Sequence, residues 1–81
     1  MLELYHAEGC PYCVKVRVFF EENSVPYISK PVSLRKVTPL KEELIKLGGK
    51  GQVPFLVDPE KKIQMYESDD IIAHVRKNYL K

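Results

Sequence analysis

Two cysteines separated by a proline and a tyrosine, in the stretch EGCPYCVKV, constrain this chain more than any other feature. Pro11 has no backbone N–H, so it fits the first turn of a helix, where that donor would lack a partner anyway. Apolar residues follow at helical spacing, namely Val16, Phe19 and Phe20. The pattern therefore predicts a helix over residues 11–22, with Cys10 directly before it.

The rest of the chain alternates short β-type runs with helical patterns. Thr38 before Pro39 is a helix start signal, and the pair Gly48-Gly49 ends that helix. We expect four strands: residues 1–5, a second that begins with residues 25–28, residues 55–57 and residues 63–66. Two further helices are expected, one over residues 39–48 and a last one that begins near residue 68, with Ser68-Asp69-Asp70 as its cap. The predicted inward faces of the two later helices are Leu40, Leu44 and Leu47, then Ile71, Ile72, Val75 and Tyr79.

This order predicts an α/β protein with the sequence β-α-β-α-β-β-α. The first βαβ unit should have a right-handed crossover and give a parallel pair of strands. The short link across Asp58-Pro59 demands an antiparallel pair. A mixed four-stranded sheet with helices packed on it follows. Since 81 residues suffice for one modest core, residues 1–81 are expected to form a single domain.

Composition and charge exclude several classes of function. The formal net charge is +2 and the 13 lysine and arginine residues are scattered, so no nucleic-acid partner is expected. No apolar run approaches the length that spans a membrane. Glu3 lies where an export signal needs basic and then apolar residues, so we expect a cytoplasmic protein without membrane partners.

The cysteine pair allows three interpretations: half of a metal site, a structural disulfide, or a redox pair. A zinc site needs about four ligands, and the remaining candidates, His6 and His74, lie far apart. We interpret His6 as a loop residue and His74 as an ordinary residue at the solvent edge. A disulfide across so short a loop would constrain the unfolded chain very little. The redox pair is favoured, since C-x-x-C beside a βαβ pattern is typical of redox proteins, and no metal is expected.

The predicted helix start gives the two thiols different environments. Cys10, at the N-cap, lies beside free N–H groups and the positive end of the helix dipole, which stabilise a thiolate. Cys13 lies one turn further along and is expected to be the more buried thiol, with the higher pKa. We therefore predict that Cys10 is the nucleophile and Cys13 the resolving thiol.

Three motifs resemble known families. Cys10-Pro11-Tyr12-Cys13 resembles the active site of dithiol glutaredoxins, and Gln52-Val53-Pro54 resembles the Val-Pro element of the thioredoxin fold, whose proline is cis. In Tyr66-Glu67-Ser68-Asp69-Asp70, the Ser-Asp-Asp part resembles the glutaredoxin segment. Its Glu-Ser part is similar to the glutathione-binding pair of glutathione transferase N-terminal domains. The resemblance implies a thioredoxin/glutaredoxin-like fold.

The resemblance also implies glutathione as a co-substrate and assigns residues to it. The Val53 backbone before Pro54 would pair with the cysteinyl part, and Tyr12 would flank the path of the sulfur. Ser68 and Asp69 at a helix N-terminus suit the γ-glutamyl carboxylate, and Glu67 or Asp69 would pair with its ammonium. Glutaredoxins commonly carry a lysine where this chain has Ala7, so Lys50 and Gln52 are the candidates for the glycine carboxylate.

The expected function is that of an enzyme, a glutathione-dependent thiol–disulfide oxidoreductase acting as a monomer. Cys10 would attack glutathione mixed disulfides or other small or protein disulfides, and glutathione or Cys13 would resolve the intermediate. The expected partners are therefore glutathione and glutathionylated or disulfide-containing proteins. Two alternatives stay open: a dimer that holds a [2Fe–2S] cluster through Cys10 and two glutathiones, and a glutathione transferase-like N-terminal domain.

Overall fold

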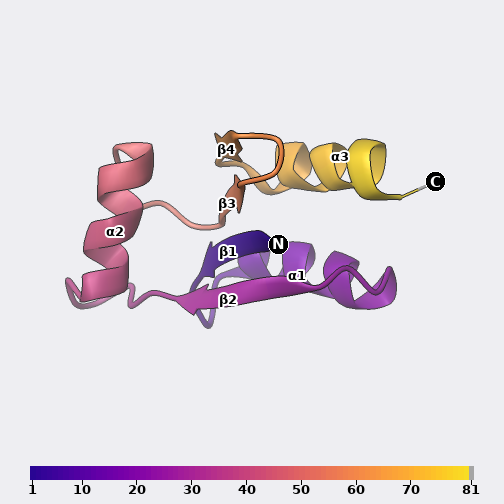
Figure 1. Cartoon of the computed structure of the whole chain (residues 1–81). Coiled ribbons are helices and arrows are strands. Elements are labelled where there is room, and N and C mark those ends of the chain that lie inside the picture. The colour runs from indigo at the N-terminus through magenta and orange to yellow at the C-terminus, as the bar shows by residue number, and fades with distance from the viewer. Residues whose placement is uncertain (81) are drawn as a thin grey trace.

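The computed structural model describes residues 1–80 and contains all the expected strands and helices in the expected order (Figure 1). These elements are β1 (Leu2–His6), α1 (Pro11–Glu22), β2 (Tyr27–Pro31), α2 (Pro39–Gly48), β3 (Phe55–Asp58), β4 (Ile63–Met65) and α3 (Ser68–Tyr79). Within the described part, no helix has both the length and the apolar character needed to cross a membrane.

The sheet has four strands in the order β2-β1-β3-β4. β1 pairs in parallel with β2, with Leu2 opposite Tyr27, and in antiparallel fashion with β3, with Tyr5 opposite Phe55. β3 and β4 form the expected antiparallel hairpin. The prediction of a mixed four-stranded sheet is therefore confirmed, and β1 lies at its centre.

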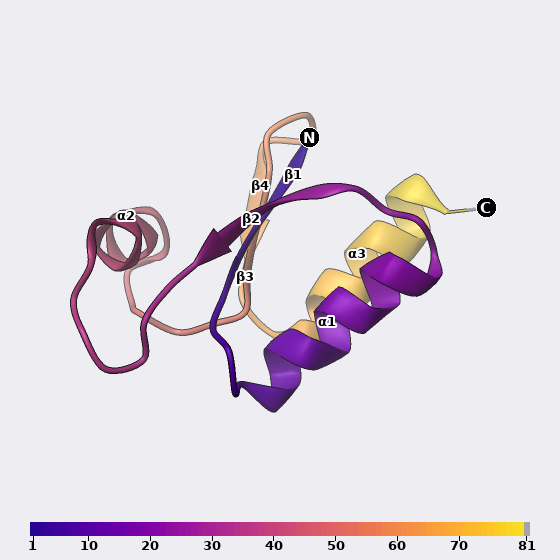
Figure 2. The ribbon, with the colours of Figure 1, turned by 90° about the horizontal axis from the view of Figure 1, so that it is seen from below.

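The helices cover both faces of the sheet. α1 and α3 lie side by side on one face, and α2 lies alone on the other (Figure 2). The core under α1 and α3 consists of Leu2, Leu4, Val16, Phe20, Leu56, Ile71 and Val75. The core under α2 is smaller and consists of Tyr5, Ala7, Val32, Leu44 and Phe55. The alternation of side chains along a strand explains why neighbouring residues of β1 contribute to different cores.

A polar network joins α2 to the sheet beside its small core. The Tyr5 hydroxyl donates a hydrogen bond to the Glu43 carboxylate. The Lys30 ammonium lies 3.0 Å from carboxylate oxygens of both Glu3 and Glu43. Burial and the bond to Glu43 raise the pKa of Tyr5 to about 12, so this hydroxyl keeps its proton throughout the physiological range.

Three expectations about the helices and strands were wrong in detail. β2 begins at Tyr27 and not at Val25, because the Val25 amide bonds back to the Phe20 carbonyl at 2.8 Å and closes the turn after α1. Leu47 is 41% exposed and Tyr79 is 36% exposed, so neither belongs to the apolar cores.

The start of the last helix also differs from the expectation. Ser68, Asp69 and Asp70 lie within the first turn of α3, and the N-cap position is Glu67, whose side chain makes no capping hydrogen bond. Glu67 has φ +71° and ψ +115°, a conformation that side chains rarely adopt and that is often found at functional sites.

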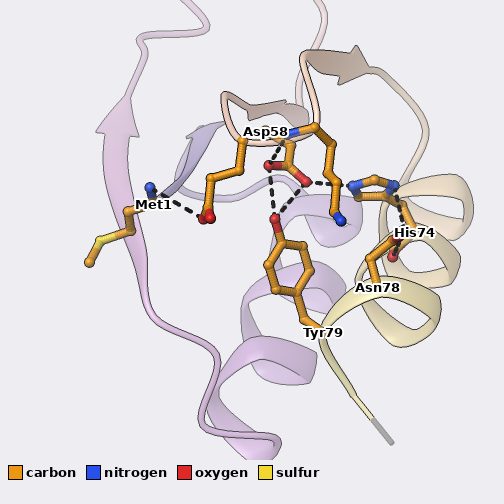
Figure 3. Close-up of polar contacts among 7 residues, drawn as sticks. Met1, Asp58, His74, Asn78 and Tyr79 are labelled. Carbon is orange, nitrogen blue, oxygen red and sulfur yellow. Dashed lines mark hydrogen bonds and ion pairs between the residues drawn. The ribbon is translucent and has the colours of Figure 1, made fainter.

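The β3–β4 hairpin is fixed to α3 by the carboxylate of Asp58, which is 1% exposed (Figure 3). It accepts hydrogen bonds from the Tyr79 hydroxyl at 2.8 and 2.9 Å, from His74 Nε2 at 2.8 Å and from the Lys61 amide at 3.3 Å. The interpretation of His74 as a solvent-edge residue was wrong, since its side chain is only 8% exposed.

The hydrogen bonds to Asp58 make this carboxylate a test of the packing of α3 on the hairpin. Burial acts to raise the pKa of Asp58, but the bonds from His74, Tyr79 and the Lys61 amide outweigh it and lower the pKa. The replacement Asp58→Asn should lower the free energy of unfolding at pH 7 by about 2–3 kcal/mol, the range for hydrogen bonds to a buried charged group. Urea unfolding measures this, with Asp70→Asn, an exposed carboxylate in the first turn of α3, as a control that should cost less than about 1 kcal/mol.

The stability difference should depend on pH. The folded-state pKa of Asp58 lies below its ordinary value of 3.8, so its stabilising contribution is complete above that value and is lost as the pH falls through the folded-state pKa. The gap between wild type and Asp58→Asn should therefore narrow below about pH 4. A gap that stays constant down to the acid transition would contradict this assignment.

Candidate functional site

The turn between β1 and α1 places Cys10 at the start of the helix. Gly9 adopts φ +84°, which reverses the chain, and Cys10 follows in an extended conformation as the N-cap residue, with Pro11 in the first helical turn. The Val14 amide closes the first turn onto the Cys10 carbonyl at 3.0 Å. The first turn of α1 has no acidic residue, so no carboxylate of that turn offsets the positive end of the helix dipole beside the thiol.

Cys13 lies one turn further and has a different environment. It is fully buried, whereas Cys10 is partly exposed, and both cysteines are free thiols. Burial raises the pKa of Cys13 to about 12, with a further contribution from a hydrogen bond with Cys10. The expected contrast between an accessible and a buried thiol is therefore present.

The thiol of Cys10 faces the loop before β3. The Val53-Pro54 peptide bond is cis, as the resemblance to the thioredoxin fold implies. Cys10 Sγ lies 4.0 Å from the Val53 carbonyl oxygen, to which it donates a weak hydrogen bond. Pro54 is buried, and Val53 is half-buried.

A cleft of about 400 Å³ opens beside this contact. Its walls are formed by Tyr12, Gln52, Val53, Pro54, Glu67, Ser68 and Asp69. These residues come from the start of α1, the loop before β3 and the start of α3, and all of them are among the predicted site residues. Tyr12 stands at the edge with 63% of its surface exposed.

Two side-chain contacts hold the walls of the cleft. Gln52 Nε2 donates a hydrogen bond to Glu67 Oε2 at 3.0 Å and so joins the loop before β3 to the start of α3. Lys15 of α1 forms an ion pair with Asp69 of α3. Both contacts are exposed, so each orients a side chain more than it stabilises the fold.

Lys50 and Ala7, the two positions that the family resemblance connects with the glycine carboxylate, lie outside the cleft. The Lys50 ammonium lies 4.8 Å from the centre of the Tyr66 ring and is not part of the cleft wall. Ala7 is 3% exposed and packs in the core under α2. Of the two candidates for the glycine carboxylate, Gln52 is therefore in the cleft and Lys50 is beside it.

The two histidines are not part of the cleft. The interpretation of His6 as a loop residue was wrong, because it is the last residue of β1 and only 6% exposed. Its Nε2 lies 2.5 Å from Ser29 Oγ, and burial lowers the pKa of its imidazole. Within residues 1–80, no group of three or more His, Cys, Asp or Glu side chains is arranged to hold a metal ion.

The supporting residues Lys15 and Tyr66 were missed by sequence reasoning. Lys15 meets Asp69 across 54 positions of the chain, and only the packing of α1 beside α3 brings them together. Tyr66 precedes the Glu67-Ser68 pair. The place of Tyr66 directly before Glu67-Ser68 was the one signal in the sequence that could have pointed to its supporting role.

Comparisons with known proteins relate the whole described chain to one family. Residues 4–80 match the family model described as glutathione S-transferase, N-terminal domain. Prostaglandin E synthase 2 of Mus musculus is 34% identical over 80 residues, which cover 98% of this chain and 20% of that protein.

Solved structures agree with this family. A glutathione S-transferase from the Antarctic clam Laternula elliptica is 30% identical, with a TM-score of 0.85, over 99% of this chain and 36% of that chain. An unclassified glutathione S-transferase from Bombyx mori is 26% identical, with a TM-score of 0.86, over the same shares. The chain thus spans only part of these relatives. They support the transferase side of the resemblance, which Glu67-Ser68 carries; the glutaredoxin side rests on the cysteine motif.

The different environments of the thiols predict selective alkylation. At pH 8, a thiol with a pKa of about 12 is ionised in roughly one molecule in ten thousand. Iodoacetamide should therefore modify native protein once, at Cys10, and urea-unfolded protein at both cysteines. Mass spectrometry of the intact protein and its peptides measures this, with Cys13→Ser as the control. Comparable rates of modification at both cysteines of native protein would contradict the assignment.

Proposed function

Given that this chain belongs to the family of glutathione S-transferase N-terminal domains, we propose that its cleft binds glutathione and that Cys10 performs thiol–disulfide exchange there. The observation that carries the proposal is the position of the Cys10 thiol. It lies at the start of α1, 4.0 Å from the Val53 carbonyl at the border of the cleft. A thiol so placed can form a disulfide with the sulfur of a ligand that lies along the Val53 backbone.

The cleft offers partners for the cysteinyl and γ-glutamyl parts of glutathione. The half-buried Val53 presents its backbone beside Cys10 and suits the cysteinyl part. The first turn of α3, at Ser68 and Asp69, has free N–H groups for the γ-glutamyl carboxylate. The carboxylate of Glu67 or of Asp69 suits the γ-glutamyl ammonium, and the Gln52 amide, which donates a hydrogen bond to Glu67 at 3.0 Å, would hold the Glu67 carboxylate in place. Tyr12 covers the approach to the sulfur.

The exchange balances without a further reagent. The Cys10 thiolate attacks the glutathione sulfur of a mixed disulfide, forms a Cys10–glutathione disulfide and releases the other thiol, which takes up a proton. A second glutathione, as thiolate, then attacks the bound glutathione sulfur. Glutathione disulfide leaves and Cys10 returns as a thiolate, so each cycle reduces the substrate sulfur to a thiol and oxidises one free glutathione, whose partner in the glutathione disulfide comes from the mixed disulfide.

Glutathione is the better resolving thiol in this scheme. Cys13 is fully buried, and burial raises its pKa to about 12, so little of it is ionised near neutral pH. Before Cys13 could attack, its thiol would have to lose its proton inside the core. We therefore assign Cys13 a secondary role, in an intramolecular disulfide formed when glutathione is scarce.

The family also favours a second candidate function, transfer of glutathione to an electrophilic compound. The clam and silkworm relatives are named as glutathione S-transferases, and this chain covers 36% of each of them. In this alternative the domain supplies glutathione, and other parts of a longer protein hold the electrophile. Thiol–disulfide exchange needs the sulfur of Cys10, whereas conjugation needs only bound glutathione.

The proposal also covers the oligomeric state, the cellular location and the substrates. We propose that residues 1–81 act as a single monomeric domain in the cytoplasm, where disulfides are transient and catalytic more often than structural. The substrates would be glutathionylated proteins and small or protein disulfides. The cluster-bound dimer is an alternative that the visible absorption spectrum of anaerobically purified protein would reveal.

The cysteine variants separate these functions. Cys10→Ser should reduce deglutathionylation of a peptide mixed disulfide at least about a hundredfold, since no other accessible thiol lies at the cleft. Cys13→Ser should keep most of the activity, because free glutathione resolves the intermediate. Steady-state rates with glutathione and a coupled reductase measure both. Equal loss in the two variants would contradict resolution by glutathione, and conjugating activity that survives in Cys10→Ser would favour the transferase function.

Neighbouring aspartates test the binding mode. Asp69 lines the cleft and Asp70 does not, although both are exposed carboxylates in the first turn of α3. Asp69→Asn should raise the KM for glutathione about three- to tenfold, the effect of one charge-assisted hydrogen bond. Asp70→Asn makes the same change of charge and should leave the KM unchanged. Equal effects from both would point to a general effect of charge in place of a contact.

A further inference from the structure

Tyr66 joins the two walls of the cleft without lining it. It lies between β4 and α3, directly before Glu67. Its hydroxyl donates a hydrogen bond to the Lys50 carbonyl at 2.6 Å and accepts one from the Lys50 amide at 3.3 Å. Both partners are backbone atoms, two positions before Gln52. The Tyr66 side chain thus holds the backbone that leads into the Gln52–Val53 wall, and Tyr66 directly precedes Glu67, the first residue of the other wall.

The ring of Tyr66 is itself held in place. It packs against Phe55 with ring centres 4.6 Å apart, and the Lys50 ammonium lies 4.8 Å from its centre on the exposed side. A Cβ atom built on Gly48 would lie 2.7 Å from Tyr66 Cζ and closer still to the hydroxyl oxygen. Glycine at position 48 is what allows the tyrosine to reach the Lys50 backbone.

The held segment has little stiffness of its own. Gly49 ends α2 with φ +93°, and Gly51 lies on the other side of Lys50, so the chain between α2 and Gln52 has glycines at both joints. Glycine has the largest backbone entropy of any residue. Restraining such a segment before a ligand binds reduces the entropy that the ligand must otherwise remove.

We propose that Tyr66 is a positioning residue for the ligand of this cleft. Its hydroxyl holds the Lys50 backbone and so fixes the spacing between the Gln52–Val53 wall and the Glu67–Asp69 wall. The inference rests on the proposed function, because the ligand whose affinity it sets is glutathione. It assigns the role of Lys50 to its backbone, in place of a contact between its ammonium and the glycine carboxylate.

Tyr66→Phe tests the proposal, since it removes the hydroxyl and keeps the ring against Phe55. The KM for glutathione should rise about three- to tenfold, the effect of losing one net hydrogen bond, while kcat at saturating glutathione stays within about twofold. Gly48→Ala disturbs the same contact from the opposite side and should raise the KM similarly.

A matched control separates positioning from general loss of stability. Tyr27→Phe removes a hydroxyl that accepts from Arg17 at 3.3 Å, away from the cleft, and should leave the KM unchanged at a comparable Tm. An unchanged KM in Tyr66→Phe would overturn the inference, as would a rise in Tyr27→Phe as large as that in Tyr66→Phe.

Direct binding distinguishes failure of this inference from failure of the proposed function. Reduced glutathione is titrated into the whole chain under reducing conditions and followed by amide chemical shifts. Weaker binding by Tyr66→Phe than by wild type supports the inference even without turnover. Equal binding by both overturns the inference alone, and no binding by wild type overturns the proposed function and the inference with it.

Discussion

The antiparallel pairing of β1 with β3 is the constraint on which the candidate site depends. Since the two strands run in opposite directions, the end of β1 and the beginning of β3 lie at the same edge of the sheet, with Tyr5 opposite Phe55. The Cys10 turn follows β1 and the Val53-Pro54 loop precedes β3. The hairpin then returns β4 to that edge, so Tyr66, Glu67 and Ser68 arrive beside them. Three loops far apart in the sequence meet because of strand direction alone.

The two cysteines at the start of α1 have different environments, and the chemistry proposed for the cleft depends on this difference. Cys10 and Cys13 lie three positions apart, yet one is at the open end of α1 and the other is fully buried. The helix start favours negative charge at the first position, while burial raises the pKa at the second to about 12. The same helix therefore leaves one thiol accessible and buries the other, which is why we propose Cys10 as the nucleophile and glutathione as the second thiol.

Much of the fold was predictable because local chemistry sets it. Pro11 and Pro39 fix the starts of two helices, Gly49 ends one, and the turn at Asp58-Pro59 produces the hairpin. The residues of the cleft were also found, since they belong to three short motifs. What the sequence did not reveal were contacts made by packing. The roles of His74 at Asp58, Lys15 at Asp69 and Tyr66 at Lys50 depend on which helix lies beside which strand. The late start of β2 depends on the turn closed by Val25.

The central proposal is that glutathione lies along the Val53 backbone with its sulfur at Cys10. A crystal structure of the Cys13→Ser variant, treated with glutathione disulfide, is the decisive experiment. We expect a disulfide between Cys10 and glutathione, with the cysteinyl backbone paired to Val53 and the γ-glutamyl group at Ser68 and Asp69. A glutathione bound to Cys10 but lying outside the cleft, or no adduct at Cys10, would contradict it.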